Sequence, residues 1–521
     1  MNQPGWHLPG IFLPFLALVL TISGCALPSL NDRVESRSVP AEQTANTRLG
    51  AAIEPLTLAH PSESGVVLLE NAHDAFAARA LLAEGADATL DVQYYIWQSD
   101  ITGTLLLDVL YRAAERGVRV RLLLDDNGIS GLDKPLAALD THPNIQVRLF
   151  NPFVVRSPKW IGYVTSFQRL NHRMHNKSFT ADNQATIIGG RNVADQYFGA
   201  GQGAMFADLD VLAIGPVVSE LSDDFDRYWS SASSYPAAII LPEPAEVDLE
   251  RVVETTRECS ASTEASRYVC AVAESGFLKN LLAGDLEYTW APVSMVSDDP
   301  AKVWGEKSKN DPVSRQLAEA IGRPERSVTL VSPYFIPTET GVEMFREMES
   351  NGVQVRVLTN SLEANDVAMV HSGYAKYRKP LLEAGVELFE LRKLPGGEPQ
   401  EERLQKSLTG SSSSSLHAKT FAVDGKRLFV GSFNFDPRSV HINTELGFVI
   451  ESPELTRMME ARFEEQVRVT AYELVLDEAG DLQWLERNGE QVITHSQDPG
   501  TGLIKRMMVS FFSFLPIESL L

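Results

Sequence analysis

The sequence predicts an α/β protein made of two fused repeats, each a mainly parallel mixed sheet flanked by helices, with one active site at their interface. Three observations lead to this fold class. A group of spaced polar residues occurs twice, each copy follows a strand–helix–strand pattern, and 521 residues suffice for two domains with cores of their own. Strand–helix–strand units favour parallel strands that are covered by helices.

The repeated group begins with a histidine and a lysine two positions apart. Its members are His175, Lys177, Asp182 and Asn192 in the first copy, and His417, Lys419, Asp424 and Asn434 in the second. Every member of the second copy lies 242 positions after its counterpart. A spacing kept at so many positions indicates a duplicated domain and not a chance match.

Each copy is predicted to fold as a β-hairpin. Alternate side chains of a strand share a face, so His417 and Lys419 should point the same way. The Asp-Gly pair that begins at Asp424 favours a tight turn, and the return strand should bring Asn434 alongside His417. Asp424 itself would lie roughly 20 Å from the histidine, at about 3.3 Å per residue. We therefore expect it, and its counterpart Asp182, to be scaffold residues.

An imidazole, an ammonium group and a carboxamide that converge suit a phosphate diester. They provide a nucleophile or acid, a charge neutraliser and a neutral donor for a non-bridging oxygen. Two carboxylates, Asp208 and Glu445, each precede a proline by eight residues, and we expect each to hold a histidine ring and fix its tautomer. The chain shows no other metal-ligand spacing, so neither a metal nor a cofactor is expected.

These residues form the double His-x-Lys-x4-Asp signature of the phospholipase D superfamily, which the chain resembles over roughly residues 60–480. The details are most similar to bacterial cardiolipin synthases of the C type. They are the run from Asn171 to Lys177, the run Gly-Gly-Arg-Asn-Val-Ala-Asp-Gln-Tyr-Phe from Gly189, and the ending Leu-Pro-Ile-Glu-Ser-Leu-Leu from Leu515.

The resemblance implies a phosphatidyltransferase that works through a phosphohistidine. It implies a phosphatidylglycerol or phosphatidylethanolamine donor, phosphatidylglycerol as acceptor and cardiolipin as product. It also implies that His175 is the nucleophile and His417 the acid, although the residues themselves are symmetric on this point. A hydrolytic phospholipase D that releases phosphatidic acid is the alternative, because water and an alcohol need the same residues. A catalytically dead, lipid-anchored binding protein is disfavoured because both motifs are intact.

The composition and net charge bear on two possible partners, nucleic acids and anionic membranes. The chain is 44% hydrophobic and 22% charged, as globular proteins are, and its net charge is −23. Nucleic acids recruit basic surfaces, so a nucleic-acid partner is not expected. Contact with an anionic membrane surface must rest on something other than overall charge.

Residues 1–24 are predicted to be a lipoprotein signal peptide, with Cys25 as the lipid anchor. The apolar run 11–24 is shorter than the roughly 20 residues that span a bilayer. No lysine or arginine precedes Arg33, so the positively charged N-terminal region of a usual signal peptide is missing. An uncleaved anchor or a wrongly assigned start codon therefore stays open. Ala26 after the cysteine favours the outer membrane, facing the periplasm, over the inner membrane. Residues 25–62 are rich in Pro, Ser, Asn and Thr and are predicted to be a tether.

The first repeat is assigned to residues 63–235. Within it, 88–97 is a buried strand, the stretch after Gly103 is an amphipathic helix that ends at Gly117, and 118–125 is the next strand. The second repeat, 326–480, has the same pattern, with strands at 327–336 and 352–358. The serine-rich loop 395–415 enters the second motif, and either borders substrate access or is an exposed insertion.

Residues 236–325 are predicted to be a polar helical connector with Cys259 and Cys270. In one continuous helix these cysteines would lie about 16 Å apart, beyond disulfide reach, whereas a turn between two helices would permit a bridge. Two free thiols are the alternative. The last segment, 481–521, is a strongly apolar tail behind Lys505 and Arg506. A lipid-facing interfacial segment is favoured slightly over a tail that packs in the core.

Overall fold

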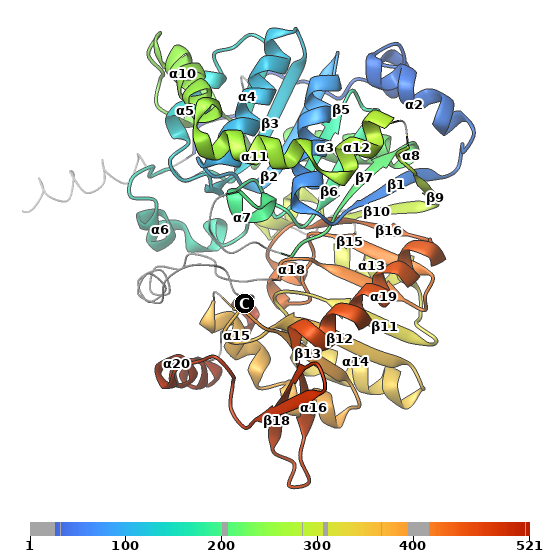
Figure 1. Cartoon of the computed structure of the whole chain (residues 1–521). Coiled ribbons are helices and arrows are strands. Elements are labelled where there is room, and N and C mark those ends of the chain that lie inside the picture. Colours follow the sequence, from blue (N-terminus) through green and yellow to red (C-terminus); the bar gives the residue numbers. More distant parts are fainter. Residues whose placement is uncertain are drawn as a thin grey trace, which may run out of the picture.

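Two mixed sheets flanked by helices make up the chain and confirm the predicted fold class (Figure 1). This computed structural model describes residues 27–31, 33–200, 207–283, 285–305, 311–365, 367–393, 416–515 and 517–521. Cys25 and the signal segment, as well as the whole of the loop 395–415, lie outside the described residues.

The first repeat is built on one sheet with the strand order β8-β4-β3-β2-β5-β6-β7-β1-β9. The strands are β1 (Ser64–Leu69), β2 (Thr89–Ile96), β3 (Arg119–Gly128), β4 (Ile145–Phe150), β5 (Ser178–Ala181), β6 (Ala185–Gly189), β7 (Asp210–Ile214), β8 (Ser234–Pro236) and β9 (Thr289–Ala291). Its helices are α3 (Ala72–Gly85), α4 (Ile101–Glu115), α5 (Asp133–Leu139), α6 (Trp160–Leu170), α7 (Asp195–Phe198), α8 (Pro216–Trp229) and α9 (Ala237–Ile240).

The second repeat has a sheet with the order β10-β16-β15-β14-β11-β12-β13-β17-β18-β19. The strands are β10 (Val293–Ser297), β11 (Ser327–Val331), β12 (Gln354–Asn360), β13 (Glu387–Leu391), β14 (Thr420–Val423), β15 (Arg427–Gly431), β16 (Leu446–Ile450), β17 (Ala471–Leu476), β18 (Leu482–Asn488) and β19 (Gln491–His495). Its helices are α13 (Val313–Ile321), α14 (Thr338–Ser350), α15 (Ala368–Ala375), α16 (Arg378–Glu383), α18 (Pro437–His441), α19 (Pro453–Thr470) and α20 (Leu503–Ser513), with a 3-10 turn η3 (Glu518–Leu520).

Parallel pairing between the named strands is restricted to the β2-β3-β4 and β11-β12-β13 strands of the two sheets, among the residues that the structure describes. The strand–helix–strand units account for these strands, as predicted. The other pairings between the named strands are antiparallel, so the sheets are less parallel than expected; isolated bridges such as that of Met174 with Thr444 are also parallel. The reason is that each motif hairpin, β5-β6 or β14-β15, adds two antiparallel strands beside the parallel group.

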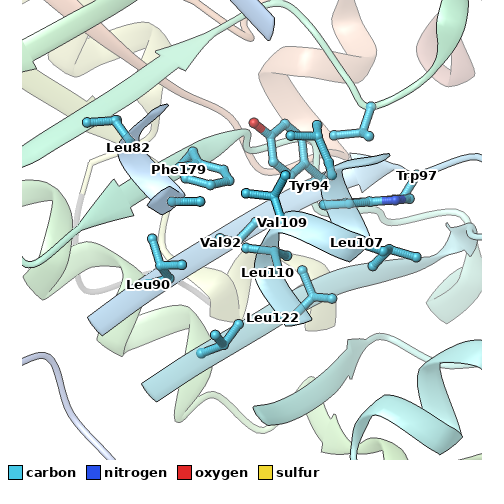
Figure 2. Close-up of a cluster of buried hydrophobic side chains, with 14 of the residues drawn as sticks. Leu82, Leu90, Val92, Tyr94, Trp97, Leu107, Val109, Leu110, Leu122 and Phe179 are labelled. Atoms are coloured by element: carbon cyan, nitrogen blue, oxygen red, sulfur yellow. The ribbon is translucent and has the colours of Figure 1, made fainter. Parts of the chain in front are cut away.

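Burial of apolar side chains fixes α4 on the first sheet. Asp100 caps the helix by accepting a hydrogen bond from the Gly103 backbone N–H, and the chain leaves it through Gly117 at a φ of 95°. Figure 2 shows side chains of α4 packed over β2 and β3. They include Leu107, Val109 and Leu110 above Leu90, Val92 and Leu122.

The two sheets meet through a shared core and a direct chain connection. Strand β9 pairs with β1 at one edge of the first sheet, and β10 pairs with β16 at one edge of the second. Only Pro292 separates β9 from β10. Buried side chains from both repeats pack together nearby; these include Ile188, Leu209, Val211, Leu428, Val430 and Phe448.

The connector is helical on both sides of β9 and β10, since α13 also lies within its predicted bounds. It contains α10 (Asp248–Ala261), α11 (Thr263–Ala273), α12 (Gly276–Ala283) and, after β9 and β10, the 3-10 turn η2 (Pro300–Trp304). The expectation of a helical segment over all of 236–325 is therefore wrong for 289–297. Those residues pair with sheet edges that are remote in sequence, such as Ser64 with Ala291, and local composition does not reveal such partners.

The expected disulfide between Cys259 and Cys270 is not formed, and both thiols are free. A turn does separate the two cysteines, because α10 ends at Ala261 and Ser262 caps α11. Cys270 nevertheless lies two helical turns beyond this corner, about 12 Å along α11 at 1.5 Å per residue. The bridge would require Cα atoms within about 7 Å of one another.

Both end segments are more ordered than predicted. Part of the 25–62 tether lies against the first repeat, where the Arg33 guanidinium donates to Ser231 O at 2.6 Å and Ser38 N donates to Asp226 at 2.9 Å. It also contains a 3-10 turn η1 (Ala41–Gln43) and a helix α2 (Arg48–Leu58). The 481–521 segment begins with the hairpin β18-β19 and ends with α20 and η3. Within the described residues, no helix is both long and apolar enough to cross a bilayer.

Candidate active site

The two motif hairpins form as predicted, and their turns explain the conserved spacing of each copy. Asp182 and Asn183 have φ values of 51°, and Asp424 and Gly425 have values of 56° and 64°. Two successive residues with positive φ match the twist of a two-residue hairpin turn. The hydrogen bonds of the turn aspartates lie away from the histidines. Asp182 accepts hydrogen bonds from the backbone N–H groups that open β2, and Asp424 from those that open β11, which is the scaffold role expected from the spacing.

The segments carrying the histidines cross to the opposite repeat. His175 N donates to Thr444 O at 2.9 Å, and His417 N donates to Ala207 O at 2.8 Å. Thr444 and Ala207 directly precede the two predicted carboxylates. Each histidine therefore enters the site beside the carboxylate-bearing segment of the other repeat, just before β16 or β7.

The ring contacts follow the same crossed pattern. His175 Nδ1 lies 2.8 Å from Glu445 Oε2, and His417 Nδ1 lies 2.6 Å from Asp208 Oδ2. Both carboxylates thus hold a histidine ring, as the sequence predicts. The pairing between repeats was not apparent from spacing alone. With Nδ1–H donating to a carboxylate, Nε2 of each ring is the nitrogen left for substrate.

The lysines lie on the same face as their histidines. Lys177 Nζ donates to the backbone oxygen of His175, and Lys419 Nζ donates to that of His417. Lys419 Nζ also lies 3.1 Å from His417 Nδ1. Two ammonium groups in one buried site can neutralise a phosphate diester anion.

The two asparagines are less equivalent than the repeat suggests. Asn192 accepts from Ile96 N at 3.1 Å and donates to the Tyr197 hydroxyl at 3.0 Å. Asn434 is buried, and its Oδ1 has no hydrogen-bond partner among the described residues. Among the residues that the structure describes, no hydrogen bond is found between Asn192 or Asn434 and either motif histidine. Asn434 is connected to the site through its backbone N–H, which donates to Ser439 Oγ at 3.3 Å.

Further residues, which the sequence did not indicate, lie against the two carboxylates. Ser432 and Ser439 donate hydroxyl hydrogen bonds to Glu445, the second at 2.9 Å. The counterpart of Ser432 in the first repeat is Gly190, where a Cβ would stand 2.1 Å from Asp208 Oδ1. The 242-residue offset aligns Ser432 with Gly190, so a comparison of equivalent positions in the two repeats points to this pair.

Two tyrosines pack edge-on against the histidine rings. The Tyr95 and His175 ring centroids are 5.2 Å apart, and those of Tyr197 and His417 are 5.0 Å apart. Tyr95 also lines a cavity of about 510 Å³ together with Gln98 and Asn127. The cavity therefore reaches the neighbourhood of His175 from the side of the first repeat.

Burial and the lysine charges set the protonation of the site. Burial lowers the pKa of His417 to about 3, with a further lowering from Lys419, and burial and the charges of Lys177 and Lys419 lower the pKa of His175 well below its ordinary value. Both rings are neutral at pH 7. Burial also lowers the pKa of Lys177 to about 7 and raises that of Glu445 to about 7. Burial would raise the pKa of Asp208, but its contacts with His417 prevail and hold it at about 2.

A family model described as "Cardiolipin synthase, PLD-like domain" matches residues 82–229 and 317–467, which include both motifs and are more than half of the chain. The chain belongs to this cardiolipin synthase family. Cardiolipin synthase C of Escherichia coli (strain K12) is 48% identical over 474 residues, covering 91% of this chain and 100% of that protein. An uncharacterized protein of Helicobacter pylori (strain ATCC 700392 / 26695) is 28% identical, covering 98% and 100%.

A solved structure shares the fold at lower sequence identity. Phosphatidylserine synthase of Haemophilus influenzae Rd KW20 matches with a TM-score of 0.54 and 14% identity, covering 79% of this chain and 87% of that one. The chain is thus a cardiolipin synthase-like enzyme of the phospholipase D superfamily. No group of three or more His, Cys, Asp or Glu side chains arranged to hold a metal ion occurs in the described part of the chain.

Proposed function

We propose that this enzyme transfers a phosphatidyl group from phosphatidylglycerol or phosphatidylethanolamine to phosphatidylglycerol, and so makes cardiolipin. The observation that carries the proposal is the crossed pair of histidine–carboxylate contacts with two lysines beside them. A site with two such histidines suits a reaction in two steps, each of which needs a nucleophile or base and an acid. The 48% identity to cardiolipin synthase C supports the choice of substrates.

In the first step, Nε2 of neutral His175 attacks phosphorus and the bond from phosphorus to the donor alcohol breaks. His417 gives its Nε2 proton to the departing oxygen. The phosphate diester brings a negative charge between Lys177 and Lys419, which raises the pKa of His417 and favours its protonated form. Glycerol leaves from phosphatidylglycerol, or ethanolamine from phosphatidylethanolamine.

In the second step, His417 takes the proton of an acceptor hydroxyl, the oxygen attacks phosphorus, and the bond to His175 breaks. Asp208 holds His417 in the tautomer that this exchange requires, and Glu445 does the same for His175. With phosphatidylglycerol the product is cardiolipin, and with water it is phosphatidic acid.

Product analysis on purified protein with phosphatidylglycerol and phosphatidylethanolamine vesicles tests this proposal. Cardiolipin with little phosphatidic acid is the expected result, whereas phosphatidic acid alone would identify a hydrolytic phospholipase D. A donor with a good leaving group such as nitrophenol needs no acid, so His417→Ala should accumulate a phosphatidyl group on His175. Mass spectrometry that finds the group on another residue would overturn the assignment of the nucleophile.

We further propose that the enzyme is a lipoprotein, anchored through Cys25 and facing the periplasm, with the outer membrane favoured. The apolar run that ends at this cysteine supports the proposal. Mass spectrometry of the mature protein should find a diacylglyceryl group on Cys25, and an unmodified thiol would refute it.

A further inference from the structure

Two helices, one from each repeat, turn their apolar sides to solvent. In α20 and the turn after it, Ile504 is 76% exposed and Phe514 is 87% exposed, whereas Val509 is buried. In α6, Val164 is 76% exposed. A helix that packs on a protein core has the opposite arrangement, with its apolar stripe facing inward. The exposed apolar residues include Trp160, Val164 and Phe167 on α6, and Ile504, Met507, Phe511 and Phe514 on α20 and its C-cap.

Both helices lie in parts of the sequence that have no carboxylates. Residues 141–181 and residues 499–517 contain neither Asp nor Glu, although the whole chain has 69 acidic residues in 521. The 41 residues of the first stretch would carry about five at that frequency. The apolar sides of α6 and α20 are therefore set in segments without carboxylates, in a protein whose net charge is −23.

Arg438, a residue close to the site, joins the end of α6 to the C-terminal residue by hydrogen bonds. The Arg438 guanidinium donates to Asn171 Oδ1 at 2.9 Å, and its backbone N–H donates to Leu521 O at 2.8 Å. Asn171 is the C-cap of α6, and Arg438 lies in α18, four residues after Asn434. Figure 1 shows α6 and α20 on the same side of the molecule, with α15 between them in the view.

A second chain of contacts links α6 to the catalytic histidine. The Tyr163 hydroxyl of α6 donates to Asn127 Oδ1 at 2.9 Å, and Asn127 donates to the Tyr95 hydroxyl at 3.3 Å. The Tyr95 ring packs against His175. Helix α6 is thus linked, through Asn127 and Tyr95, to the cavity that these two residues line.

We propose that the seven exposed apolar residues named above form one docking surface, which rests on a phospholipid bilayer and presents the site to lipid headgroups. This inference depends on the proposed function for the identity of the ligand. Trp and Phe are favoured at the boundary between headgroups and acyl chains. Hydrogen bonds connect α6 and the C-terminal segment to residues beside the site, and a bilayer is the source of the phospholipids that the proposed reaction uses.

The charge distribution explains why such a surface is needed. An anionic bilayer repels a protein of net charge −23, although salt limits this repulsion beyond about 8 Å. Burial of apolar side chains is favourable whatever the sign of the surface charge. Because residues 141–181 and 499–517 carry no carboxylates, these segments themselves add no negative charge that an anionic bilayer would repel.

Serine substitutions in the full-length chain test the docking surface. One variant changes Trp160, Val164 and Phe167, and another changes Ile504, Met507, Phe511 and Phe514. A matched control changes Leu58, Val269 and Val469, which are exposed apolar residues on α2, α11 and α19. Each protein is assayed for phosphatidyl transfer on phosphatidylglycerol–phosphatidylethanolamine vesicles and on monomeric short-chain phosphatidylglycerol.

We expect each docking variant to lose about tenfold or more on vesicles, which corresponds to roughly 1.4 kcal/mol of lost binding. Turnover of the short-chain lipid should change less than about twofold, and the control should match the wild type on both substrates. Equal loss on both substrates would mean that these residues support the fold, and full activity on vesicles would mean that the surface is not used. Either result would overturn the proposal.

Fluorescence provides a measurement that does not depend on turnover. Acyl chains brominated near the headgroup should quench Trp160, seen as the difference between wild type and Trp160→Phe on the same vesicles. Absence of this quenching would refute contact with the bilayer and would assign the surface to a protein partner. Quenching in a protein that transfers no phosphatidyl group would instead refute the proposed function and leave the docking surface in place.

Discussion

His175 Nδ1 lies 2.8 Å from Oε2 of Glu445, a residue 270 positions later in the other repeat. The reciprocal contact joins His417 to Asp208 at 2.6 Å. Neither repeat therefore contains a complete histidine–carboxylate pair. The interface between the repeats assembles both pairs, so it forms the candidate active site as well as part of the core.

Replacement of either histidine should abolish transfer. His175→Ala and His417→Ala are each expected to lower turnover by at least about 10³-fold, because both steps require both rings. Thermal melting should stay close to that of the wild type. Mixing the two inactive proteins should restore nothing, since every chain still lacks one ring. Residual turnover of more than a few per cent in either variant would contradict a single shared site.

Gly190→Ala should damage the site through Asp208. The added Cβ would stand 2.1 Å from Asp208 Oδ1, so the carboxylate must move away from His417. We expect a loss of kcat of about 10²-fold or more, as for other residues that orient a catalytic group. Gly276→Ala is the matched control, because a Cβ there meets nothing within 4 Å. An unchanged kcat in Gly190→Ala would show that the orientation of Asp208 is not critical.

Asp424→Asn should affect stability and leave the chemistry intact. The carboxylate accepts hydrogen bonds from Glu325 N, Arg326 N and Ser327 N. Loss of the charged acceptor should cost about 1–3 kcal/mol, measured as a lower midpoint in urea unfolding. The kcat of the folded protein should be unchanged. A large loss of kcat at wild-type stability would contradict the scaffold role of this turn.

The dependence of kcat/KM on pH should be a narrow bell centred near neutrality. As the pH falls below about 7, Glu445 takes up a proton and no longer stabilises a charged His175. As the pH rises above about 7, Lys177 loses its proton and binds the phosphate diester less well. Lys177→Arg should move the alkaline limb to higher pH, because a guanidinium stays protonated. An alkaline limb that does not move would assign it to another group.

The hairpins and the carboxylates were predictable because their determinants are local. A spacing of two residues in the segments that lead into β5 and β14 places Lys177 and Lys419 with their histidines, although these residues precede the strands. A turn dipeptide fixes the return strand at Asp424. The crossed pairing was not predictable, because it depends on how two sheets dock. The strands at 289–297 were missed for the same reason, since their partners lie far away in sequence.

The free thiols of Cys259 and Cys270 show a different limit of sequence reasoning. The turn at Ser262 that would permit a bridge is present, but the lengths of the helices on either side decide the distance. Spacing alone did not fix where in each helix the cysteines would fall. The outward orientation of α20 is another example, because an apolar tail suits either a core or a membrane until its neighbours are known.

Pro292 alone separates the edge strands of the two sheets, and buried side chains from both repeats pack together beside it. This packing opposes a motion that would separate the repeats, so the same two histidines must serve both alcohols. In the proposed two-step mechanism the first alcohol leaves before the second arrives. With phosphatidylethanolamine as donor and phosphatidylglycerol as acceptor, double-reciprocal plots should be parallel lines, the kinetic pattern of a ping-pong enzyme.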